Sequence, residues 1–96
     1  MFGRHRSLDK ALKRSIDWLT TQPGVTKVVI GLSAACRHKY PPGHLRYKSS
    51  VPGGIKINGY SGKGVTDFFI RLQTPAAETP LREALNKKFT SPGGSS

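Results

Sequence analysis

The hydrophobic pattern near the start of the chain has the period of an α-helix. Apolar residues recur three and four positions apart and form one stripe, made of Leu8, Ala11, Leu12, Ile16 and Leu19. Ser7 can cap such a helix and Pro23-Gly24 ends it, so the sequence predicts a helix over residues 7–22. A second helix is predicted over residues 79–89, with Thr79 as its cap.

Between these helices the pattern changes to the alternation of β-strands. Segments rich in β-branched and aromatic residues predict three strands, over residues 25–32, 55–60 and 65–73. Gly62-Lys63-Gly64 predicts a hairpin turn between the last two strands. Residues 33–53 are predicted to form one long loop, within which residues 45–48 can pair as a short strand.

This order of elements predicts a single α+β domain over residues 7–89. A three-stranded, mainly antiparallel sheet with both helices on one face is the simplest way to bury the apolar stripes. The other face of the sheet is then open to solvent and carries Val29, Lys56, Tyr60, Phe69 and Arg71. Phe69 is either exposed there or covered by the long loop. Residues 1–6 are predicted as a basic arm and residues 90–96 as a disordered tail.

Charge is distributed unevenly along this pattern. The 96 residues include 16 Lys and Arg but only 5 Asp and Glu, which gives a formal charge of +11. Seven basic residues and three tyrosines lie between Asp17 and Asp67, where the sequence has no other acidic residue. Basic residues interleaved with aromatic rings are typical of nucleic-acid binding. We therefore expect binding to RNA more than DNA, and largely independent of sequence, because no predicted helix carries a row of base-reading side chains.

The basic and aromatic residues are densest within the predicted loop. Arg and Lys neutralise phosphates, and aromatic rings stack on bases. The predicted nucleic-acid-binding residues are Arg37, Lys39, Tyr40, Arg46, Tyr47 and Lys48 in the loop, and Lys56, Tyr60, Lys63, Phe69 and Arg71 beyond it. Two alternatives stay open. The loop is only a solvated basic segment, or the protein is a regulatory module that docks on the acidic surface of a protein partner.

Other chemistry has weaker support in the sequence. Cys36, His38 and His44 are weak metal candidates, because their spacing matches no standard zinc site and a structural site takes four ligands. No metal or cofactor is therefore predicted. No enzyme is predicted either, because no acidic residue lies near these side chains in the sequence. The single cysteine and the lack of a membrane-length apolar stretch lead us to expect a cytoplasmic protein without membrane contact. The oligomeric state is left open.

Glycine and apolar positions also carry a resemblance to known proteins. The matching segments are residues 5–7, 23–29, 51–57, 62–65 and 67–70. They resemble an uncharacterised prokaryotic family that is described as predicted metal-binding, over residues 5–72. The resemblance implies the order of strands and no activity, and the cysteine pairs of some relatives are absent here. The element order is also similar to that of the double-stranded-RNA-binding domain, but only Arg82 stands where that domain begins its basic second helix.

Overall fold

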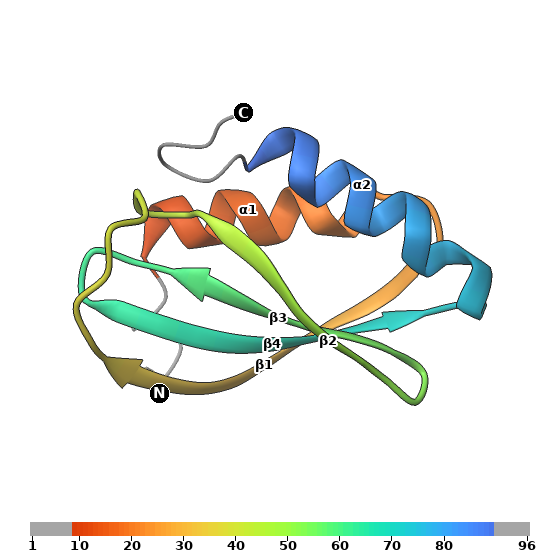
Figure 1. Cartoon of the computed structure of the whole chain (residues 1–96), viewed down its shortest axis with the longest axis horizontal. Helices are drawn as coiled ribbons and strands as arrows, with labels where there is room; N and C mark the ends of the chain where they lie inside the picture. The colour runs from red at the N-terminus through yellow and green to blue at the C-terminus, as the bar shows by residue number, and fades with distance from the viewer. Residues whose placement is uncertain (1–8, 90–96) are drawn as a thin grey trace.

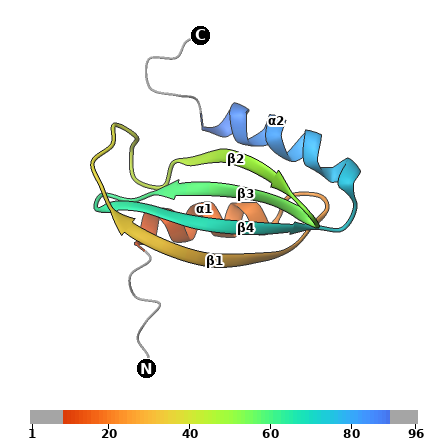
Figure 2. The same ribbon diagram turned by 60° about the horizontal axis from the view of Figure 1, so that its bottom comes forward.

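The computed structural model describes residues 9–89, which form a helical layer on one face of a β-sheet (Figure 1). The elements are α1 (Lys10–Thr20), β1 (Val25–Ala35), β2 (Leu45–Val51), β3 (Gly54–Tyr60), β4 (Gly64–Leu72), the 3₁₀ turn η2 (Pro75–Ala77) and α2 (Glu78–Lys88). The four strands form one antiparallel sheet in the order β1-β4-β3-β2. Figure 1 shows α1 and α2 on the same side of this sheet, and Figure 2 shows α1 behind the strands and α2 beside β2. The predicted α+β class is confirmed.

The sheet has one strand more than the three predicted, because β2 was expected only as a possible short pairing over residues 45–48 within a long loop; that pairing is confirmed and extends to Val51. Residues 33–53 were expected to connect two strands, but β1 continues to Ala35 and β2 takes up most of the second half. The loop between β1 and β2 therefore spans only residues 36–44. β2 pairs with β3 through a tight turn in which Gly53 adopts φ of 85°, a conformation that suits glycine.

The first helix is shorter than the predicted range of residues 7–22, and its N-cap lies two residues later than the expected cap. Asp9 is its N-cap, and the Asp9 carboxylate accepts a hydrogen bond of 2.9 Å from the backbone N–H of Leu12. Ser7, the expected cap, lies outside the described residues. The same holds for the predicted basic arm, residues 1–6, and for the predicted tail, residues 90–96.

The second helix also begins differently from the prediction. Thr79 is not its cap, because η2 leads directly into the helix at Glu78 and no side chain caps the backbone there. Pro80 lies within the first turn, where the N–H that proline lacks would have no helical partner. Lys87 and Lys88 occupy the last turn, where positive charge offsets the negative end of the helix dipole.

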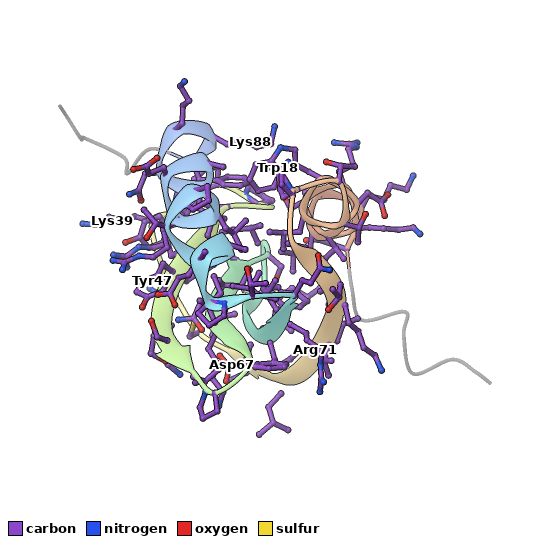
Figure 3. All side chains as sticks on the ribbon, turned by 90° about the vertical axis from the view of Figure 1, so that its right-hand side faces the viewer. Trp18, Lys39, Tyr47, Asp67, Arg71 and Lys88 are labelled. Carbon is purple, nitrogen blue, oxygen red and sulfur yellow. The ribbon has the colours of Figure 1, made fainter. Side chains whose placement is uncertain are left out.

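The hydrophobic core lies between the helices and the sheet. Its most deeply buried side chains are Leu12, Leu19, Leu45, Ile55, Ile57, Phe68, Ile70, Leu81 and Leu85. A Cβ at Gly59 would lie 2.6 Å from the Phe68 ring and 2.7 Å from the Leu12 side chain, so α1 packs closely on β3 at this glycine. Trp18 packs edge-to-face on Phe89, with ring centroids 5.5 Å apart, and closes the gap between the helices (Figure 3). The core therefore draws on both helices and leaves one face of the sheet uncovered by either.

Candidate nucleic-acid interface

The face of the sheet turned away from α1 and α2 is called the outer face here, and the strand register defines its members. Residues directly opposite each other on neighbouring strands lie on the same face. Phe69 is opposite Val29 on one side and Lys56 on the other, and Arg71 is opposite Lys27. The prediction that Val29, Lys56, Phe69 and Arg71 share a face is confirmed. Figure 3 shows Arg71 on the side of the sheet away from the helices.

Exposed cations surround Phe69, which is half-buried at the centre of the outer face. Within residues 9–89 this face carries five of them: Lys27, Arg46, Lys48, Lys56 and Arg71. Asp67 is the only carboxylate that the register places among them in the described part of the chain. The Lys48 ammonium lies 4.0 Å from Asp67, and both side chains are about half exposed, so this ion pair is weak. The outer face is therefore strongly positive, which favours binding of a polyanion.

At one end of the outer face, the loop between β1 and β2 folds back onto the sheet. The Tyr60 ring lies 4.5 Å from the Tyr40 ring and 4.7 Å from the His38 ring, measured between centroids. Tyr40 in turn stacks on His44 at 4.7 Å. We call these four residues the aromatic cluster. Because they cover it, the Tyr60 side chain is only 9% exposed. The expectation that Tyr60 lies open to solvent on the sheet is wrong.

Hydrogen bonds of His38 hold the loop against the β3–β4 turn. Its Nε2 bonds to the backbone carbonyl oxygen of Ser61 at 2.8 Å, and its Nδ1 accepts from the backbone N–H of Tyr40 at 3.2 Å. Since a carbonyl oxygen only accepts, Nε2 carries the proton and the ring is the neutral tautomer. Both ring nitrogens of His38 therefore serve the structure of the loop.

Gly43 fixes the other end of the loop against α1. Its backbone N–H donates to the carbonyl oxygen of Tyr60 at 2.6 Å, and its carbonyl oxygen accepts from the Ser15 hydroxyl at 2.5 Å. The φ angle is 90°, and a Cβ here would lie 2.9 Å from the carbonyl oxygen of Ala11. Only glycine fits without strain. The loop between β1 and β2 is thus held at both ends by hydrogen bonds to the rest of the fold.

His44 belongs to the interior more than to the surface. Its side chain is only 4% exposed and packs edge-to-face on Phe89, with ring centroids 5.6 Å apart. Burial lowers the pKa of His44, and the positive charge of Arg46 lowers this pKa further. Its Nε2 is buried without a hydrogen-bond partner among the described residues. The folded protein therefore favours the neutral form of this ring.

The three weak metal candidates do not form a site. Cys36 is exposed, His38 uses both ring nitrogens in the loop, and His44 packs against Phe89. Among residues 9–89 no group of three or more His, Cys, Asp or Glu side chains is close enough to hold a metal ion. The arrangement of these residues therefore supports no metal centre.

A second group of basic residues lies beside the aromatic cluster. Arg37 and Lys39 are exposed in the loop, and Lys63 is exposed in the β3–β4 turn. The turn lies against the start of the loop, where the backbone N–H of Cys36 donates to the carbonyl oxygen of Lys63 at 3.3 Å. Figure 3 shows Lys39 at the periphery of the molecule. We call Arg37, Lys39 and Lys63 the loop-end cations.

Tyr47 is separated from the other predicted binding residues. It is opposite the buried Ile57 and therefore lies on the helix side of the sheet. The guanidinium of Arg82 lies 4.0 Å above its ring, and its hydroxyl is 2.7 Å from the Ser50 hydroxyl and 3.4 Å from a Glu78 carboxylate oxygen. These contacts join β2 to α2. Tyr40, in contrast, lies in the aromatic cluster with the Arg46 guanidinium 5.2 Å from its ring centroid.

Lys27 and Asp67 belong to the outer face but were not among the predicted binding residues. The register places Lys27 opposite Arg71, and it places Asp67 two residues from Phe69 on β4. Because Lys27 precedes the apolar Val28 in a predicted strand, the sequence could have indicated that the Lys27 side chain points outward. Its position beside Arg71 depends on the pairing of β1 with β4, which local sequence does not reveal.

Comparison with protein-family models finds no match, and comparison with curated proteins and with solved structures finds no significant match. The resemblance to a predicted metal-binding family stays a prediction. No helix in the described part of the chain has the length and apolar character needed to cross a membrane. The geometry and charge of the described residues therefore carry the functional argument.

Proposed function

We propose that this protein binds nucleic acid, RNA more than DNA, through the outer face of its sheet and largely independently of sequence. The observation that supports this proposal best is the group of five exposed cations around Phe69, on the face that neither helix covers. Such a face combines the two contacts that single strands require, which are charge for the phosphates and a ring for a base. No catalytic residue, metal or cofactor is part of the proposal.

The spacing of these side chains suits an extended strand of nucleic acid. Neighbouring β-strands lie about 4.8 Å apart, and alternate residues on one strand lie about 6.7 Å apart. Lys27 and Arg71 therefore stand to one side of Phe69, and Arg46 and Lys48 to the other. A backbone that crosses the sheet meets cations before and after the ring. Loop-end cations extend the same positive surface beyond the aromatic cluster.

Single-stranded RNA is the form that the face favours. An aromatic ring can stack only on a base that is free of a partner strand, and sequence-tolerant recognition of single strands commonly uses open sheets. Phe69 is half-buried, so part of its surface remains for such a base. Duplex binding would use the cations alone, and its affinity would not depend on the ring.

The alternative function is docking on an acidic protein surface. Val29 supports it, because this apolar side chain is 39% exposed directly beside Phe69. Protein interfaces often combine an apolar centre with a charged rim. A protein partner would be recognised by shape, whereas nucleic acids of unrelated sequence would share the binding that we propose.

Fluorescence-anisotropy titration of labelled single-stranded RNA, duplex RNA and duplex DNA tests the proposal. Five phosphate contacts predict a log–log salt slope of about −3.5 for single strands and about −4.5 for duplexes. We expect single-stranded RNA to bind most tightly at physiological salt. Absence of binding by all three forms at physiological salt would contradict the proposal and leave the acidic protein partner as the better explanation.

A further inference from the structure

Asp67 is an unexpected residue at the centre of a phosphate-binding face. It lies two residues from Phe69 on the same face of β4, so the two Cα atoms are about 6.7 Å apart. A carboxylate in this position repels phosphates and reduces the benefit of the surrounding cations. Figure 3 shows Asp67 on the side of the sheet away from the helices, as it shows Arg71. Phosphate binding therefore does not explain the presence of a carboxylate at this position.

The stability of the fold does not supply that reason. The ion pair with Lys48 has an N–O distance of 4.0 Å between two half-exposed side chains, and such pairs contribute little. No side-chain hydrogen bond within residues 9–89 uses the Asp67 carboxylate oxygens. The carboxylate thus presents free acceptors to solvent beside an aromatic ring.

We propose that Asp67 reads the base that stacks on Phe69, by accepting a hydrogen bond from an exocyclic amino group of that base. This inference rests on the proposed nucleic-acid binding and adds a preference at one position. Cytosine presents its N4 amino group as a donor, whereas uracil presents its O4 oxygen as an acceptor at the same place. The carboxylate attracts the first and repels the second, so the site prefers cytosine to uracil.

The neighbours of Asp67 fit this role. Phe69 holds the base plane, and Lys56, directly opposite Phe69, stands where it can contact the phosphate of the same nucleotide. A base on the ring extends toward both ends of β4, and Arg71 occupies the other end. The base edge therefore meets an acceptor on the side of Asp67 and a donor on the side of Arg71, so the amino group of cytosine can form its hydrogen bond only on the side of Asp67.

A comparison of oligocytidine with oligouridine of equal length tests the inference. These probes differ in the base edge while both carry small pyrimidine rings, so differences in stacking are minor. Asp67→Asn removes the charge but keeps the shape, and Asp17→Asn on the exposed surface of α1 makes the same chemical change away from the face. Anisotropy titrations of the wild type and both variants at physiological salt give the dissociation constants.

We expect the wild type to bind oligocytidine about three- to tenfold more tightly than oligouridine, the range expected for one hydrogen bond. Asp67→Asn should abolish this ratio and strengthen oligouridine binding, while Asp17→Asn should keep the ratio. Equal affinities in the wild type, or a ratio that survives in Asp67→Asn, would overturn the role of Asp67 and leave the proposed function intact. Failure of the wild type to bind either probe would overturn both.

Discussion

The outer face has a covered end and an open centre, and each contains one outward-facing aromatic residue of the sheet. Tyr60 at the covered end is 9% exposed beneath the loop between β1 and β2. Phe69 at the open centre stays partly accessible, with Lys56 and Val29 as its direct neighbours. Both rings lie on the outer face by the alternation of their strands. They differ in exposure because the loop between β1 and β2 covers Tyr60 and leaves Phe69 partly accessible.

This difference shows that residue type alone does not identify a binding residue in a basic sequence. Tyr40, His38 and His44 of the loop contribute to the aromatic interleaving that indicates nucleic-acid binding, yet their rings pack the loop on the sheet. The cations of the open centre have no comparable packing role. We therefore propose that the aromatic cluster stabilises the fold and that the open centre is the part of the face that binds nucleic acid.

The largest expected effect is on the covered end. Replacing Tyr60 with Ala removes a buried ring from the aromatic cluster, so the free energy of unfolding should fall by about 3 kcal/mol. Tyr60→Phe keeps the ring and should change stability far less. Urea denaturation followed by circular dichroism measures both variants. A stable Tyr60→Ala protein that has lost RNA binding would place the binding ring at the covered end and contradict the comparison.

The open centre should respond in the opposite way. Phe69→Ala removes the stacking ring, and affinity for single-stranded RNA should fall roughly tenfold, within the range known for one stacked base. Phe69→Leu is the matched control for apolar packing, and it should lose similar affinity because it also lacks a ring. Duplex binding should change little in either variant. Anisotropy gives the affinities and thermal melting checks the fold. If Phe69→Leu binds single strands like the wild type, stacking on this residue is wrong.

The smallest expected effect is a pH dependence at the covered end. Burial, and then Arg46, lowers the pKa of folded His44, whereas the ordinary value is 6.5. As the pH falls below 6.5, the unfolded chain takes up the proton first, so stability decreases until the folded pKa is reached. His44→Phe keeps an aromatic ring and removes this titration. Its melting temperature should therefore fall less than that of the wild type between about pH 7.5 and about pH 5.5. An equal fall in both proteins would exclude His44 as a source of acid sensitivity.

Much of the fold could be predicted because local patterns determine it. The alternation of Phe68, Ile70 and Leu72 identified β4, and the apolar stripe identified α1. β2 was predicted only as a possible short pairing over residues 45–48, because it is an edge strand with cations and serines at most positions and alternation gave little signal. Its pairing with β3 is what makes it a strand.

The candidate site could be predicted only in part, for a related reason. Alternation within single strands correctly placed Lys56, Phe69 and Arg71 on one face. The position of Lys27 beside Arg71 depends on the contact between β1 and β4, which are distant in the sequence. The covering of Tyr60 depends on the path of a loop held by a glycine with positive φ and by hydrogen bonds to distant residues. Such long-range contacts leave no periodic pattern.

The most direct test of the central claim compares two triple variants that each remove three positive charges. The first variant replaces Lys27, Lys56 and Arg71 of the outer face with Gln. The control variant replaces the exposed Lys10, Lys13 and Lys87 of the helical layer with Gln. Fluorescence anisotropy with single-stranded RNA over a salt series measures the affinity of each. Each lost phosphate contact should reduce affinity about fourfold at physiological salt, so the outer-face variant should bind roughly 60-fold more weakly with a salt slope smaller by about 2. The control should stay close to the wild type. Equal losses in the two variants would show that overall charge, and not the outer face, attracts the nucleic acid.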